Sequence, residues 1–207
     1  MLARAESAQD WAQIRAICCE TGAAAPDQAR WPFFGEFWVG AYERFLPEWT
    51  YLLRAPDGSI AGYLTGCPET SRLEVQRKFK QWPLLWAGIA SRKFAWNADT
   101  RQFVRRRLGL EKGPEQRFSA ETEQALHKTY PAHLHINLKP EFQGLREGDR
   151  LLEMFFKDLQ SARVSGVHVR CGQGPLGFYL RTGFQVLEQI EVRPGVLVFT
   201  LGKRIRS

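Results

Sequence analysis

The residues best placed to do chemistry lie between Tyr130 and Phe184. An alternating apolar strand at 134–138 is followed by Pro140 and by a loop at 143–148, which contains Gln and Gly and opens an amphipathic helix. Such a loop points backbone N–H groups and the positive end of a helix dipole at one spot. This arrangement predicts a pyrophosphate site, and therefore a transferase that holds a phosphate-bearing carrier.

The composition predicts one domain over residues 1–207. A hydrophobic fraction of 44% is enough for a real core. No apolar run approaches the roughly 20 residues that span a bilayer, and the first residues lack the apolar core of a signal peptide. The four cysteines (Cys18, Cys19, Cys67 and Cys171) lack C-x-x-C spacing. We therefore expect a cytoplasmic protein with reduced thiols, no metal site and no membrane partner.

The positive charge is concentrated in one segment. The chain has a net charge of +7, and residues 71–107 contain ten Lys or Arg against two acids, so this segment supplies the whole excess. A basic segment can bind nucleic acid, an anionic membrane or an acidic ligand, or it can be a solvated helix face. We favour the solvated face and do not expect nucleic acid as a partner.

The element pattern predicts a mixed α/β architecture, with hairpins and one β-α-β unit in the second half. Strands are expected at 2–5, 49–54, 60–67, 134–138, 166–171, 184–192 and 196–201. Helices are expected from Ser7 or Asp10 to Glu20, at 35–45, 119–128, 147–162 and 174–181, with Gly183 as the cap of the last. Two or three more helices are expected in the basic segment, broken near Pro83 and near 97–100, and loops at 22–32 and 109–119.

Two motifs resemble the GNAT superfamily of acyl-coenzyme A N-acyltransferases. One is the loop Gln143-Gly-Leu-Arg-Glu-Gly148, and the other is Phe178-Tyr179 followed by Gly183-Phe184. The phrase from Tyr130 to Leu138 is similar to a bacterial subgroup that also resembles the acetyltransferase-like domain of O-GlcNAcases. The resemblance implies a central, mostly antiparallel mixed sheet flanked by helices. The coenzyme-binding core would be 130–184, and a basic helical insertion would lie around 69–128.

The resemblance also implies a coenzyme site and a general acid. Backbone groups of the strand would pair with the pantetheine arm of acetyl-CoA, and the loop and the first helical turn would face its pyrophosphate. Tyr179 would protonate the leaving thiolate. The coenzyme-binding residues expected in this way are Ile136, Leu138, Gln143, Gly144, Leu145, Arg146, Glu147, Gly148, Asp149 and Arg150.

The acceptor side is predicted less specifically. Since strand side chains alternate, His133, His135 and Asn137 share one face and are candidates to line the acceptor cleft. His135 is a candidate base, whereas Asn137 cannot act as a base at neutral pH. Trp31 and Phe34 belong to an aromatic run that either walls the substrate cleft or packs in the core.

Several departures from the family pattern leave alternatives open. Arg146 stands where the family has Gly, although a guanidinium can itself bind phosphate. Glu147 and Asp149 add negative charge beside the expected polyanion. We therefore expect an acetyl-CoA-dependent N-acetyltransferase acting on a primary amine of a small molecule or peptide. The alternatives are an inactive GNAT-fold protein that binds acyl-CoA or a protein partner, and a nucleic-acid-associated protein using 72–107. A homodimer is also left open.

Overall fold

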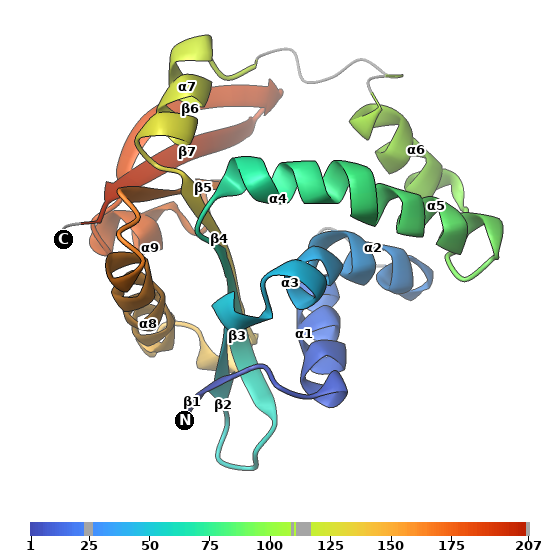
Figure 1. Ribbon diagram of the computed structural model, residues 1–207, viewed down its shortest axis with the longest axis horizontal. Coiled ribbons are helices and arrows are strands. Elements are labelled where there is room, and N and C mark those ends of the chain that lie inside the picture. Colours follow the sequence, from blue (N-terminus) through green and yellow to red (C-terminus); the bar gives the residue numbers. More distant parts are fainter. Residues whose placement is uncertain (23–26, 109, 111–116, 206–207) are drawn as a thin grey trace.

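The structure is a computed structural model that describes residues 1–22, 27–108, 110 and 117–205. Its central sheet has seven strands in the order β1-β2-β3-β4-β5-β7-β6 (Figure 1). The strands are β1 (Leu2–Arg4), β2 (Thr50–Arg54), β3 (Ile60–Cys67), β4 (Ala132–Leu138), β5 (Gly166–Cys171), β6 (Gln185–Arg193) and β7 (Val196–Arg204).

The sheet opens between β4 and β5. These two strands pair in parallel at only two positions, Ala132 with Val167 and His133 with His168, whereas the other neighbours pair antiparallel. On its other side β4 stays paired with β3 as far as Leu138, which lies opposite Gly62. The β5-facing edge of β4 is therefore free of strand partners beyond His133.

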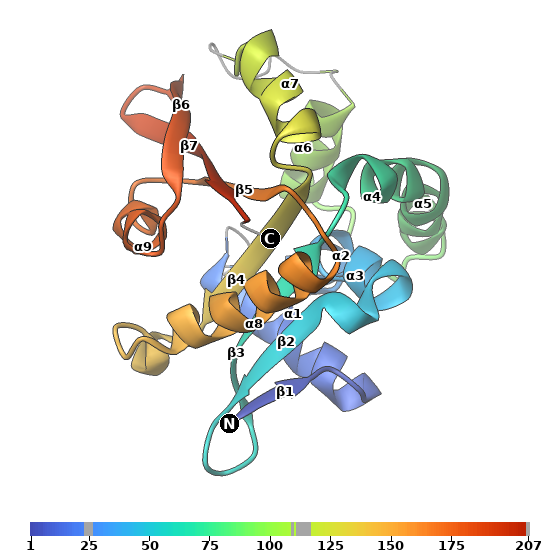
Figure 2. The ribbon, with the colours of Figure 1, turned by 60° about the vertical axis from the view of Figure 1, so that its left-hand side comes forward.

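Helices cover both faces of the sheet, as Figure 1 and Figure 2 show. On one face, α8 (Glu147–Ser161) and α9 (Leu176–Arg181) enclose a core that includes Leu151, Phe155 and Tyr179. On the other face, α1 (Ala8–Thr21) and α3 (Gly40–Phe45) pack on β2 and β3 through residues such as Ile14 and Tyr42. The two faces thus have separate cores.

The segment between β3 and β4 is helical. It contains α4 (Thr70–Gln76), a π-helical turn (Arg77–Gln81), α5 (Trp82–Ala90), α6 (Ala98–Arg107) and α7 (Ala120–Lys128). A third core joins α5 and α6 to α2 (Trp31–Trp38), and it contains Phe33, Phe34, Phe37 and Leu85. The predicted basic helical insertion is therefore present and packs on the N-terminal helices.

The predicted mixed α/β fold is confirmed, with three local corrections. The helix does not break at Pro83, because the preceding π turn widens the backbone where a proline would otherwise clash with the carbonyl four residues earlier. The helix expected at 35–45 is two helices, α2 and α3, and the first begins at Trp31, inside the loop expected at 22–32. Residues 23–26 of that loop, and 109 and 111–116 of the second predicted loop, lie outside the described residues.

Candidate functional site

A cavity of about 1630 Å³ lies where β4 and β5 diverge. Residues 134–138 of β4 line one wall, and residues 169–172 at the end of β5 line the other. The loop before α8, the first turn of α8 and residues 178, 179 and 181 of α9 also contribute to the lining. The cavity thus joins the free edge of β4 to the predicted phosphate loop.

The loop between β4 and α8 turns through two left-handed residues. Gly144 has φ +76°, and Arg146, the residue that precedes α8, has φ +59°. Gly adopts this conformation without strain, whereas for Arg it costs about 1–2 kcal/mol. Asp149 donates its N–H to the Arg146 carbonyl at 3.1 Å, and the earlier N–H groups of a helix have no acceptor within it. Arg146 therefore adopts a backbone conformation that Gly would adopt without strain.

Gly148 lies where the backbone of α8 approaches the cavity wall. A Cβ atom at this position would lie 3.0 Å from the Phe178 ring and 3.4 Å from a Leu138 methyl group. These three residues all line the cavity, so β4, α8 and α9 meet at this point. An alanine at residue 148 would require the Phe178 ring to shift slightly, and a larger side chain would displace that ring further.

The acidic residues of the loop are partly neutralised. Glu147 accepts a hydrogen bond from the Arg150 guanidinium at 2.8 Å. The Gln143 side-chain amide donates to the Leu138 carbonyl at 2.9 Å, which ties the loop to the end of β4. Arg146, Glu147 and Asp149 line the cavity, so cationic and anionic groups both face the predicted pyrophosphate position.

Tyr179 lines the cavity from α9 and is 5% exposed. Burial raises the pKa of its phenol, and the nearby Cys171 thiol raises it further, so the hydroxyl stays protonated at neutral pH. Helix α9 ends at Arg181, and Gly183 caps it two residues later, with φ +88° and an N–H that donates to the Leu180 carbonyl at 3.1 Å. The predicted glycine cap is confirmed, and it helps to fix the position of Tyr179 between Phe178 and Phe184.

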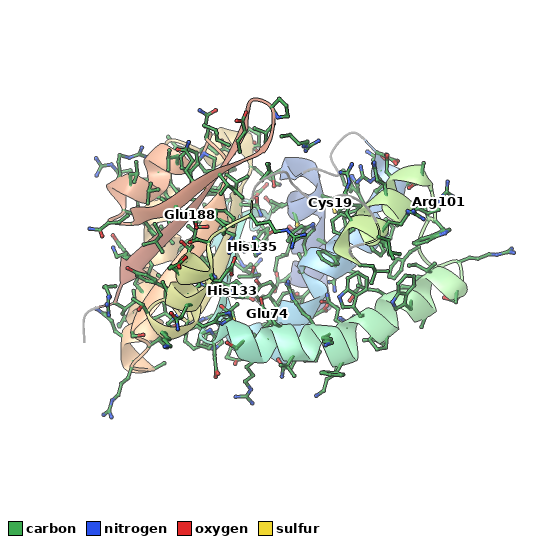
Figure 3. The ribbon with its side chains drawn as sticks, turned by 90° about the horizontal axis from the view of Figure 1, so that it is seen from above. Cys19, Glu74, Arg101, His133, His135 and Glu188 are labelled. Atoms are coloured by element: carbon green, nitrogen blue, oxygen red, sulfur yellow. The ribbon has the colours of Figure 1, made fainter. Side chains whose placement is uncertain are left out.

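His135 lines the same cavity from β4. Its ring packs edge-on against Trp38, with 5.5 Å between ring centroids. Burial, together with the Arg77 guanidinium, lowers the pKa of His135 to about 4, so the imidazole is neutral at pH 7. Among the described residues, neither ring nitrogen has a hydrogen-bond partner. Figure 3 places His133 and His135 near the middle of the molecule.

Asn137 lines the cavity but has its amide engaged. It donates to the Tyr63 hydroxyl at 2.8 Å and accepts from the Thr21 hydroxyl at 3.0 Å. Thr21 and Trp38 also line the cavity. The sequence gives no signal for Thr21. It places Trp38 in the aromatic run from Trp31 to Phe45 but does not show which members of that run lie near His135.

Five candidates from the sequence lie outside the cavity lining that the structure describes: Trp31, Phe34, His133, Leu145 and Arg150. Trp31 and Phe34 pack in the third core with α5 and α6. Both ring nitrogens of His133 are used, at 2.7 Å from the Tyr42 hydroxyl and 2.8 Å from the Thr70 hydroxyl. Leu145 is 63% exposed, and Arg150 is turned toward Glu147.

Among the described residues, no group of three or more His, Cys, Asp or Glu side chains is arranged to hold a metal ion. No helix in the described part of the chain combines the length and apolar character needed to cross a membrane.

The chain is similar in structure to acetyltransferases, although no family model matches it. It aligns with SsHAT at 24% identity and a TM-score of 0.69, over 100% of this chain and 98% of that one. A candidate acetyltransferase of the GNAT family from Desulfovibrio desulfuricans matches at 14% identity and a TM-score of 0.59, over 100% and 99% of the two chains. An aminoglycoside 6'-N-acetyltransferase complexed with coenzyme A matches at 8% and 0.55, over 100% and 98%. The fold is therefore that of GNAT acetyltransferases, whereas the narrower resemblance to the O-GlcNAcase-related subgroup stays a prediction.

Proposed function

We propose that this protein is an N-acetyltransferase that moves the acetyl group of acetyl-CoA to a primary amine of a small molecule or peptide. The observation that carries the proposal is the cavity between β4 and β5, which joins a free strand edge to a loop at the N-terminus of α8. A free strand edge suits an amide-bearing arm such as pantetheine, and a helix N-terminus suits a pyrophosphate. The match to an acetyltransferase complexed with coenzyme A supports this assignment of the cavity.

The proposed reaction is direct attack of the amine on the thioester carbonyl. The C–N bond forms, the C–S bond breaks, and the coenzyme leaves as a thiolate that needs a proton. Tyr179 is the proposed donor, because its hydroxyl is protonated at neutral pH and its side chain lines the cavity. His135 is the proposed acceptor of the amine proton, since it is neutral at pH 7 and has ring nitrogens without partners among the described residues.

The acceptor would enter beside Trp38 and Thr21. These residues line the cavity together with His135 and Asn137, on the side formed by α1 and α2. Asn137 is proposed as a positioning residue, because its amide joins Thr21 of α1 to Tyr63 of β3. The protein would act in the cytoplasm, because acetyl-CoA is available there.

Calorimetric titration with acetyl-CoA and with free coenzyme A tests the donor site. Micromolar affinity, about −8 kcal/mol, is expected for both ligands, and it would justify a screen of amines. No binding of either ligand by the folded protein would overturn the enzyme proposal and favour an inactive GNAT scaffold.

Replacing Tyr179 by Phe tests the general acid. With an amine found in the screen, kcat should fall on the order of a hundredfold, while the Kd for acetyl-CoA stays nearly unchanged because the ring still fills its site. Phe184→Leu, which alters packing beside Tyr179 without removing a hydroxyl and lies outside the cavity lining, is the matched control. An unchanged kcat in Tyr179→Phe would remove Tyr179 from the mechanism.

A further inference from the structure

The helical segment after β3 has one unusual solvent-facing surface. Residues 70–90 form one continuous helical path through α4, the π turn and α5, which is about 30 Å long at the rise of an α-helix. Leu73, Gln81, Leu85 and Gly88 are buried on its inner side. Figure 3 shows this path along one edge of the molecule, so its outer side is accessible over its whole length.

Four large apolar side chains of this path are exposed. They are Val75 (57%), Phe79 (67%), Leu84 (48%) and Trp86 (39%). Trp86 also stands between Trp82 and Trp96, with 6.1 Å between the ring centroids in each pair. Val75 and Phe79, four residues apart, and Trp86, seven residues after Phe79, follow the spacing of one helix side. Leu84 is two residues from Trp86 and points to a different side. Isolated exposed apolar residues are ordinary, but several that share a helix side indicate a contact surface.

Cationic side chains flank these apolar groups. Arg72, Lys78, Lys80, Arg92 and Lys93 are exposed, and Glu74 is the only acidic residue in the sequence from 70 to 96. Within this stretch, only Glu74 can therefore offset the positive charge of these side chains. We call these cationic residues, together with Val75, Phe79 and Trp86, the basic aromatic face.

We propose that the basic aromatic face docks on an anionic lipid surface. A bilayer with anionic headgroups offers negative charge and an apolar interior at one plane, which matches Lys and Arg flanking Val75, Phe79 and Trp86. Nucleic acid would satisfy the cations and could stack on Phe79 and Trp86, but it offers no apolar medium for Val75. The lipid surface accounts for both sets of side chains.

The proposal concerns surface attachment and not a membrane span. The sequence predicts no membrane partner because it has no apolar run long enough to span a bilayer. That criterion does not detect a helix that lies on a membrane surface, because the apolar residues of such a helix are spaced along one side and do not form a run. The face lies on the insertion and shares no residue with the cavity lining. Lipid binding and acetyl transfer can therefore be tested separately.

The experiment is co-sedimentation of the full chain with vesicles of phosphatidylcholine alone or mixed with phosphatidylglycerol. We expect binding only to the mixed vesicles, weakened by added salt and accompanied by a blue shift of tryptophan fluorescence. The variant Phe79→Ser/Trp86→Ser should bind at least about tenfold more weakly, and Lys78→Glu/Lys80→Glu should also lose at least about tenfold.

Two matched controls lie on other elements. Val186→Ser on β6 removes an exposed apolar side chain, and Lys157→Glu on α8 reverses an exposed charge, and neither should change vesicle binding. Circular dichroism verifies that every variant is folded. Failure of the unmodified protein to bind the mixed vesicles overturns the proposal. Equal vesicle binding by the unmodified protein and by Phe79→Ser/Trp86→Ser also overturns it. A third contradicting result is a dimer in solution that does not bind vesicles and that Phe79→Ser/Trp86→Ser dissociates.

Discussion

The two ends of the cavity are built in different ways. At the end proposed to bind the coenzyme (the coenzyme end), the decisive features belong to the backbone: the free edge of β4, the left-handed residues 144 and 146, and the N-terminus of α8. At the end proposed to bind the amine (the acceptor end), the features are side chains from distant parts of the chain, such as Thr21, Trp38 and His135. A backbone site needs a short continuous sequence, whereas a side-chain site needs the whole fold to assemble it.

The largest expected effect is the response to acid of three buried histidines, and of these three only His135 lines the acceptor end of the cavity. Burial lowers the pKa of His135 and of His168 to about 4, and lowers that of His133 well below its usual value. Since the unfolded histidines titrate near 6.5, their stabilisation is complete above pH 6.5 and is lost as the pH falls toward 4. His135 alone should account for a loss of about 3 kcal/mol at pH 4.

Urea unfolding between pH 7 and pH 4 measures this loss. His168→Gln should flatten the pH dependence, whereas His127→Gln, at an exposed position, should leave it unchanged. The free energy of unfolding will stay level across this range if the buried histidines do not govern the response.

The second difference is sensitivity to added bulk at the coenzyme end. Gly148→Leu should weaken acetyl-CoA binding about tenfold to a hundredfold, because overpacking costs about 1–3 kcal/mol and the Phe178 ring must leave its place in the wall. Gly174→Ala is the matched control, since it also lines the cavity but its Cβ would meet no atom within 4 Å. Calorimetry compares the two variants, and equal affinities would show that close packing at residue 148 does not shape the site.

The sequence predicts features that neighbouring residues determine, and it does not predict features that the folded molecule determines. The strand at 166–171 matches β5 residue for residue, and the helix predicted at 147–162 matches α8 to within one residue, because apolar periodicity and turn residues act locally. The conformation of Arg146 could not be predicted, since only the folded loop requires positive φ there. Likewise, the sequence could not separate Trp38, which lines the cavity, from Trp31 and Phe34, which pack in the third core.

The third difference concerns the acceptor end during turnover. His135→Gln should lower kcat on the order of a hundredfold at neutral pH, with the Kd for acetyl-CoA unchanged, because the ring lies beside Trp38 and not beside the phosphate loop. The pH profile is the diagnostic measurement. Activity of the unmodified protein should fall as the pH approaches 4, where His135 becomes protonated, and the variant should lack this titration. A parallel loss of coenzyme affinity would instead indicate damage to the whole cavity.

The smallest expected effect separates the backbone contribution of Arg146 from its side-chain contribution at the coenzyme end. Arg146 and Arg163 both have positive φ, +59° and +55°, so replacing either by Gly should raise the free energy of unfolding by about 0.5–1 kcal/mol. Only Arg146 lines the cavity. If its guanidinium binds phosphate, Arg146→Gly should weaken acetyl-CoA binding about tenfold, while Arg163→Gly leaves the affinity unchanged.

Thermal unfolding and calorimetry on the same two variants separate the two contributions. Equal stabilisation with unequal affinity would mean that the loop binds through both its backbone and the Arg146 side chain. If Arg146→Gly and Arg163→Gly are equally stabilised and bind acetyl-CoA with equal affinity, the coenzyme end binds through its backbone alone. Loss of the Arg146 guanidinium would then have no effect beyond the relief of backbone strain. The comparison with the acceptor end would become sharper in that case, since one end would depend on backbone form and the other on side-chain chemistry.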